Sequence, residues 1–116
     1  MMSEVLNKTK IDQLANEIGP ENIPVLLGIF LGELTAYKER LIQLEGEELA
    51  TYLASICHEL KSSAASFGAD RLCQFALDID FRVKLNQDLE LEKSVDFMLE
   101  LIGFTYDTYQ SFVQVS

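Results

Sequence analysis

Large apolar residues recur between positions 23 and 44 at alternating steps of four and three, the spacing of one face of an α-helix. The series is Ile23, Leu27, Phe30, Leu34, Tyr37, Leu41 and Leu44. Asn22 is the expected N-cap, Pro24 suits the first turn, and "EGEE" around Gly46 is the expected end. Because such a helix must bury its apolar face against other helices, the pattern predicts a helical bundle.

Three later segments repeat this periodicity, and none alternates as a strand would. Their apolar series are Leu49, Leu53, Ile56, Leu60, Ala64 and Phe67, then Leu72, Ala76, Ile79 and Val83, then Leu91, Val95, Met98, Ile102, Tyr106, Tyr109 and Val113. The connections are a few residues long, which favours antiparallel neighbours. We therefore expect an all-α fold, an antiparallel four-helix bundle over about residues 20–113.

A shorter segment precedes the bundle. Thr9 is its expected cap, and Ile11, Leu14 and Ile18 form its apolar side. It predicts a short N-terminal cap helix over about residues 9–18 that lies on the bundle. A chain of 116 residues suits a single domain, so we expect residues 1–116 to form one.

Composition and charge argue against several classes of function for this chain. A net charge of −10 argues against nucleic-acid binding, which depends on clustered Lys and Arg. We expect no export, because no charged and then apolar leader opens the sequence. We also expect no membrane span, since the longest apolar run, "IPVLLGIFLGEL", is shorter than the roughly 20 residues that a bilayer needs. Cys57 and Cys73 are expected to be reduced thiols in a cytoplasmic protein. Cys57, His58 and Cys73 lack a fourth ligand for zinc, and the dispersed glycines form no ATP loop, so we expect no metal and no cofactor.

His58 is the only histidine, and it lies in the stretch "ICHELKSSAASFGA". At about 100° per residue it points roughly 200° away from Ile56, nearly opposite the apolar stripe. The wheel therefore predicts an exposed imidazole. The positions around it are mostly short and form an open platform for another protein; they include Ala54, Ser55, Ser62 and Ala65.

The stretch "HELKSSAASFGADRL", His58 to Leu72, resembles the signature of histidine-containing phosphotransfer (HPt) domains. The matching features are the histidine, Leu60, Lys61, a run of small residues, and then Gly68 with Ala69. A four-helix bundle with the motif on its second long helix is the fold that this family implies. With "EIG" and "PVLLGIFLGEL", the motif also resembles phosphorelay proteins of quorum sensing.

The resemblance implies that His58 accepts a phosphoryl group on Nε2 from the receiver domain of a hybrid sensor kinase and passes it to a response regulator of the LuxO type. Lys61, one turn on, would face the transferred oxygens as a positive charge. The partner would supply Mg²⁺, so the chain itself is expected to be a phosphoryl carrier without an ATP site. A single apolar stripe on each helix predicts a monomer.

Family members usually carry glycine after the lysine, whereas this chain has Ser62, which is small enough to keep the site open and can hydrogen-bond the phosphoryl group or the partner. Ala54, Ser55 and Ala65 are the expected partner-docking residues. Gly68 is expected to be structural, where the second long helix meets the third.

Two alternatives remain open on the sequence alone. "HELKS" also resembles the phosphoacceptor box of histidine kinases, which would make the chain a fragment of a dimerisation hairpin, although the usual following proline is absent. A helical adaptor that binds signalling partners without accepting phosphate would not need His58. A serine nucleophile at Ser55 or Ser62 lacks an evident oxyanion hole or orienting carboxylate.

Overall fold

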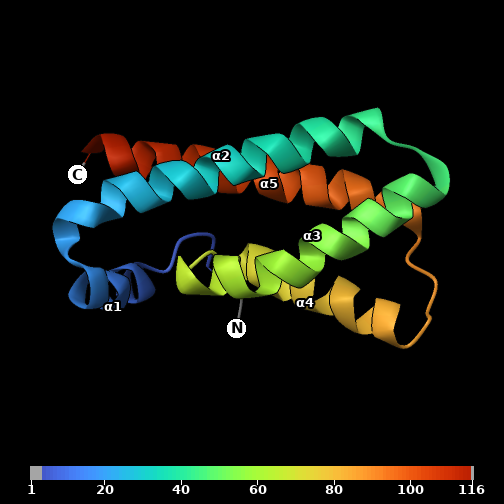
Figure 1. The fold of residues 1–116 in the computed structure, drawn as a ribbon, viewed down its shortest axis with the longest axis horizontal. Helices are drawn as coiled ribbons and strands as arrows, with labels where there is room; N and C mark the ends of the chain where they lie inside the picture. The colour runs from blue at the N-terminus through green and yellow to red at the C-terminus, as the bar shows by residue number, and fades with distance from the viewer. Residues whose placement is uncertain (1–3, 116) are drawn as a thin grey trace.

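The computed structural model describes residues 4–115, and these form an all-α bundle. The elements are α1 (Lys8–Ile18), a short 3₁₀ turn η1 (Pro20–Asn22), α2 (Ile23–Gln43), α3 (Gly46–Ser66), α4 (Asp70–Lys84) and α5 (Leu91–Val115). Successive long helices run antiparallel, α2 packs on α5, and α3 packs on α4 (Figure 1). The predicted fold class, an antiparallel four-helix bundle with a short N-terminal helix, is confirmed.

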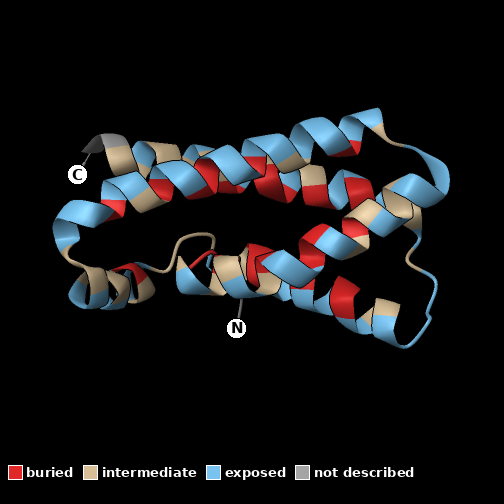
Figure 2. Ribbon diagram, viewed as in Figure 1, coloured by how far each residue is buried: buried red, intermediate tan, exposed pale blue. Residues whose placement is uncertain are grey.

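The predicted apolar stripes face one another in a continuous core (Figure 2). Leu27, Phe30 and Leu34 of α2 are almost completely buried, as are Leu53, Ile56 and Leu60 of α3. Tyr109 of α5 is also buried, and its hydroxyl donates a 2.6 Å hydrogen bond to the carbonyl of Phe67. No helix within residues 4–115 has an apolar stretch long enough to cross a bilayer.

The ends of two helices differ from the predictions. α1 begins at Lys8, and its cap is Asn7 rather than Thr9: the side-chain oxygen of Asn7 accepts hydrogen bonds from the backbone N–H groups of Thr9 and Lys10. Asn22 does occupy the cap position of α2, but its side chain does not cap the helix. Instead, its amide donates a 2.6 Å hydrogen bond back to the carbonyl of Ile18, since η1 joins the two helices directly.

The N-terminal segment forms hydrogen bonds and an ion pair with the turn between α3 and α4. Asn7 donates its backbone N–H to the carbonyl of Gly68 at 2.7 Å and its side-chain amide to Asp70 at 2.8 Å. Lys10 forms a 2.8 Å ion pair with the same Asp70 carboxylate. Gly68 has φ of +77°, and a Cβ atom there would lie 2.5 Å from the Asn7 carbonyl oxygen. Both the backbone conformation and the close approach of α1 therefore require glycine at this turn.

Candidate functional site

His58 lies midway along α3, and its side chain is 64% exposed. Ile56, Cys57 and Leu60 of the same helix point into the core, so the apolar periodicity of α3 leaves the imidazole on the solvent side. This is the orientation that the helical wheel predicts. A ring so exposed is accessible to a partner without any movement of the bundle.

Asp80 of α4 lies beside the ring and was not singled out from the sequence. Its Oδ1 atom is 3.3 Å from Nδ1 of His58, while its Oδ2 atom accepts hydrogen bonds from Lys61 Nζ at 2.9 Å and from Lys84 Nζ at 2.8 Å. The Asp80 residue is only 7% exposed. One buried carboxylate thus joins the histidine to two ammonium groups across the α3–α4 interface.

The hydrogen bonds of this cluster favour an ionised Asp80 carboxylate. The hydrogen bonds from Lys84 and Lys61, and then that from His58, hold the pKa of Asp80 well below its usual range, although burial acts in the opposite direction. The hydrogen bond to Asp80 likewise raises the pKa of Lys84. Because an ionised carboxylate only accepts hydrogen bonds, the facing Nδ1 of His58 must carry a proton. In a neutral ring this leaves the lone pair on Nε2, and no hydrogen bond within the described residues occupies that atom.

The structure brings together some of the predicted site residues and separates others. Lys61 is 25% exposed and turns toward Asp80, next to His58. Ser62 and Ser55 are exposed on the same face of α3, and Ala54 is half-buried there. Ala65 is different, because it packs partly against the core and lines a hollow of about 370 Å³ with residues of α1. It therefore belongs to the edge of the site that α1 borders.

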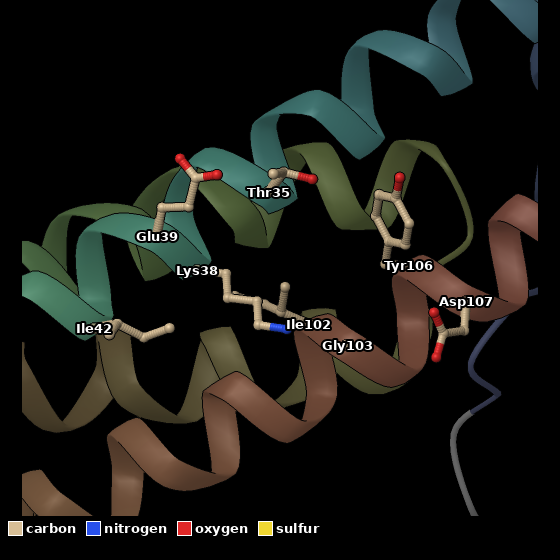
Figure 3. Close-up of a pocket in the computed structure, with 8 residues that line it drawn as sticks. All are labelled: Thr35, Lys38, Glu39, Ile42, Ile102, Gly103, Tyr106 and Asp107. Carbon is tan, nitrogen blue, oxygen red and sulfur yellow. The ribbon is translucent and has the colours of Figure 1, made fainter.

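Another hollow lies at the opposite end of this face. It measures about 480 Å³ and is lined by Arg40, Leu44, Glu47, Glu48, Thr51, Tyr52 and Ser55. A separate groove of about 440 Å³ runs between α2 and α5, lined by Thr35, Lys38, Glu39, Ile42, Ile102, Gly103, Tyr106 and Asp107 (Figure 3). No lining residue of this groove comes from α3 or α4, so it takes no part in the His58 site.

The two cysteines do not contribute a reactive thiol. Both are buried and unpaired to each other, and burial, reinforced by the negative charge of Asp80, raises the pKa of Cys57 to about 12. Cys73 donates a 3.4 Å hydrogen bond to the carbonyl of Lys61, so it links α4 to the helix that carries the histidine. Within the part of the chain that the structure describes, no three His, Cys, Asp or Glu side chains are placed to hold a metal ion.

The sequence did contain a signal for Asp80. It stands between Ile79 and Val83, inside the apolar series of α4, and Lys84 follows four residues later. A carboxylate next to a core stripe usually has a cationic or hydrogen-bonding partner, because burying it alone is costly. The identity of those partners depends on the register between α3 and α4, which the periodicity of a single helix does not contain.

Comparison with known proteins shows which proteins the chain resembles. The family model described as "Hpt domain" matches residues 25–102. The chain is 51% identical to "Phosphorelay protein LuxU" of Vibrio harveyi, over 96% of this chain and 97% of that relative. It is 47% identical to the protein of the same name in Vibrio cholerae serotype O1, over 97% and 99% respectively. No solved structure matches the chain closely enough to count as a relative.

Proposed function

The chain belongs to the Hpt domain family of phosphorelay proteins, and we propose that His58 is the residue that carries the phosphoryl group. The observation that supports this role is the exposed imidazole whose Nδ1 faces the buried, ionised Asp80. Such a ring presents the lone pair of Nε2 to solvent in a fixed orientation.

The transfer step follows from this geometry. The Nε2 lone pair attacks the phosphorus of an aspartyl phosphate, the N–P bond forms, and the P–O bond to the partner aspartate breaks with its electron pair leaving on the carboxylate. The ring then carries substituents on both nitrogens and is positively charged. The Asp80 carboxylate, which holds the Nδ1 proton, offsets that charge. The reverse reaction uses the same contacts, so transfer onward to a second aspartate needs no further group on this chain.

Lys61 and Ser62 would act on the phosphoryl oxygens. The Lys61 ammonium is one turn from His58 and is held at Asp80 Oδ2, so its charge is already beside the reacting ring. Ser62 is exposed on the same face, where its hydroxyl can hydrogen-bond an oxygen of the phosphoryl group or of the partner. Mg²⁺ would be held by the partner, and this chain would act as a carrier without ATP hydrolysis.

We further propose that the partners are the receiver domain of a hybrid sensor kinase upstream and a LuxO-type response regulator downstream, in quorum-sensing signal transduction. Similarity to two LuxU proteins along almost the whole chain supports this placement. The two free cysteines support a reducing, cytoplasmic setting. The acidic chain would bind neither nucleic acid nor membrane.

The test is incubation with a phosphorylated receiver domain, with the protein product examined by ³¹P NMR and by the acid and base stability of its label. We expect an acid-labile, base-stable label on wild type and none on His58→Gln, which lacks the only imidazole of the chain. His58→Gln should melt like wild type, within about 0.5 kcal/mol, because the ring is exposed. An unlabelled wild type that still binds the receiver domain would indicate an adaptor, and a stable dimer in sedimentation would indicate a kinase hairpin.

A further inference from the structure

A row of exposed apolar side chains runs along α4 next to the His58 site. Leu77 and Phe81 on the helix, and Leu85 immediately after it, are 42%, 54% and 55% exposed. They follow one another at steps of four residues, so they form one continuous ridge on the helix surface. Single exposed apolar residues are common, but a row of three large ones marks a surface that another molecule covers.

This ridge borders the phosphoryl site. At about 100° per residue, Leu77 and Phe81 lie roughly 60° and 100° from Asp80 around α4, on the side away from the buried Ile79. Asp80 contacts His58, and Lys84 lies on the same side of α4 and contacts Asp80. A partner that reaches Nε2 of His58 and also covers α4 would therefore meet the ridge.

The charge distribution indicates which kind of partner fits. Lys61 and Lys84 both contact Asp80, whose carboxylate is buried and faces His58. The exposed carboxylates nearby have partners of their own, since Glu59 accepts a hydrogen bond from Tyr37 and Asp78 forms an ion pair with Arg82. Ser55 and Ser62, which are exposed on the same face of α3, are uncharged, whereas the chain as a whole carries a net charge of −10. An anionic pocket that holds an aspartyl phosphate would be repelled by much of this molecule and attracted to this face.

We propose that the Leu77–Phe81–Leu85 ridge is a docking surface for the phosphorylated receiver domain, which sits across α3 and α4. This inference rests on the proposed function of His58. The apolar ridge would supply binding energy, and the two lysines would attract the anionic pocket toward the histidine. The alternative placement, over the hollow between α1 and Ala65, would leave the ridge uncovered.

The experiment compares two matched double variants with two phosphoryl donors. Leu77→Ser with Phe81→Ser removes the two ridge side chains that lie within α4 and leaves Leu85. Ile29→Ser with Phe104→Ser removes one aliphatic and one aromatic side chain of similar exposure, 55% and 58%, from α2 and α5. The donors are a phosphorylated receiver domain below its KM and phosphoramidate, which needs no docking surface. We expect the ridge variant to accept phosphate from the receiver domain about 10-fold more slowly or worse, with wild-type labelling by phosphoramidate. The control variant should match wild type with both donors.

Circular dichroism melting of each variant shows whether slower transfer comes from unfolding and not from lost docking. If the double variant is unstable, the single variant Phe81→Ser is used in its place. Receiver-driven transfer that equals that of the control variant would overturn the ridge proposal. So would loss of transfer in Ala65→Trp with an unaffected ridge variant, because the partner would then lie on the α1 side. If neither donor labels the wild-type protein, the proposed role of His58 as phosphoryl acceptor would be overturned instead.

Discussion

The Nδ1 atom of His58 lies 3.3 Å from Oδ1 of Asp80, a contact between residues 22 positions apart that joins α3 to α4. The carboxylate is buried and the imidazole is exposed, so Asp80 holds the ring at Nδ1 while the rest of the ring faces solvent. This contact sets the tautomer that leaves Nε2 nucleophilic. We expect phosphoryl transfer at His58 to depend on an ionised Asp80 in this position.

Asp80→Asn tests this dependence. An amide can donate as well as accept, so it no longer requires a proton on Nδ1. We expect phosphoramidate labelling of His58 to slow by about 10-fold or more. In ¹⁵N NMR the imidazole should shift toward the tautomer with the proton on Nε2. A purely structural role would change the melting temperature and leave the tautomer as it is in wild type.

The lysines should determine how far the pKa of Asp80 is lowered. Lys84 makes the strongest contribution to that lowering, ahead of Lys61 and His58, so Lys84→Gln should raise the pKa of Asp80 more than His58→Gln does. In wild type the carboxylate should stay ionised below pH about 3.9, the ordinary value for aspartate. The ¹³C chemical shift of the Asp80 carboxyl group, followed from pH 7 downward in the three proteins, measures this. Equal titration curves would contradict the assigned order.

Gly68→Ala should be more destabilising than Gly46→Ala. Both glycines have positive φ, +77° and +63°, so an L-residue costs about 1–2 kcal/mol at either position. Only at Gly68 would the added Cβ also lie 2.5 Å from a backbone oxygen, that of Asn7, whereas Gly46 has nothing within 4 Å. The difference between their urea unfolding free energies isolates the contact with the segment before α1. Equal losses would mean that this segment moves aside without cost.

Asp70→Asn should destabilise the protein in a pH-dependent way. Partial burial opposes ionisation of Asp70, but the hydrogen bonds from Lys10 and Asn7 outweigh it and lower the pKa of the carboxyl group. A lowered pKa in the folded state contributes stability above the unfolded value near 3.9, and that contribution is lost as the pH falls through the folded pKa.

At pH 7 we expect a loss of about 1 kcal/mol, since the Lys10 side chain is 41% exposed and solvent weakens the ion pair. Urea unfolding of the variant and of wild type should differ by this amount at pH 5 to 7, with the difference shrinking below about pH 4. A difference that persists unchanged at pH 2 would show that the lost contact is not ionic.

Much of the fold could be predicted because it depends on periodicity. An apolar residue at every third or fourth position determines which side of a helix is buried, and short connections then favour antiparallel neighbours. Ile56 and Leu60 are buried and His58 is exposed for this local reason. Periodicity did not decide the cap of α1, because Asn7 and Thr9 are both favourable N-cap residues and lie only two positions apart. Asn7 also contacts Gly68 and Asp70, some 60 residues away, and these contacts cannot be predicted from a local pattern.

The candidate site, like the fold, could be predicted only in part. The helical repeat alone places the imidazole, a lysine one turn away and several small residues on the side of α3 opposite its apolar stripe, so this part of the site could be predicted from the sequence. The contacts of Asp80 with His58 and Lys84, and the position of Ala65 next to α1, are seen only once the helices are packed together. Those neighbours depend on the register and rotation of packed helices, which side-chain packing across the interface sets and no single helix encodes.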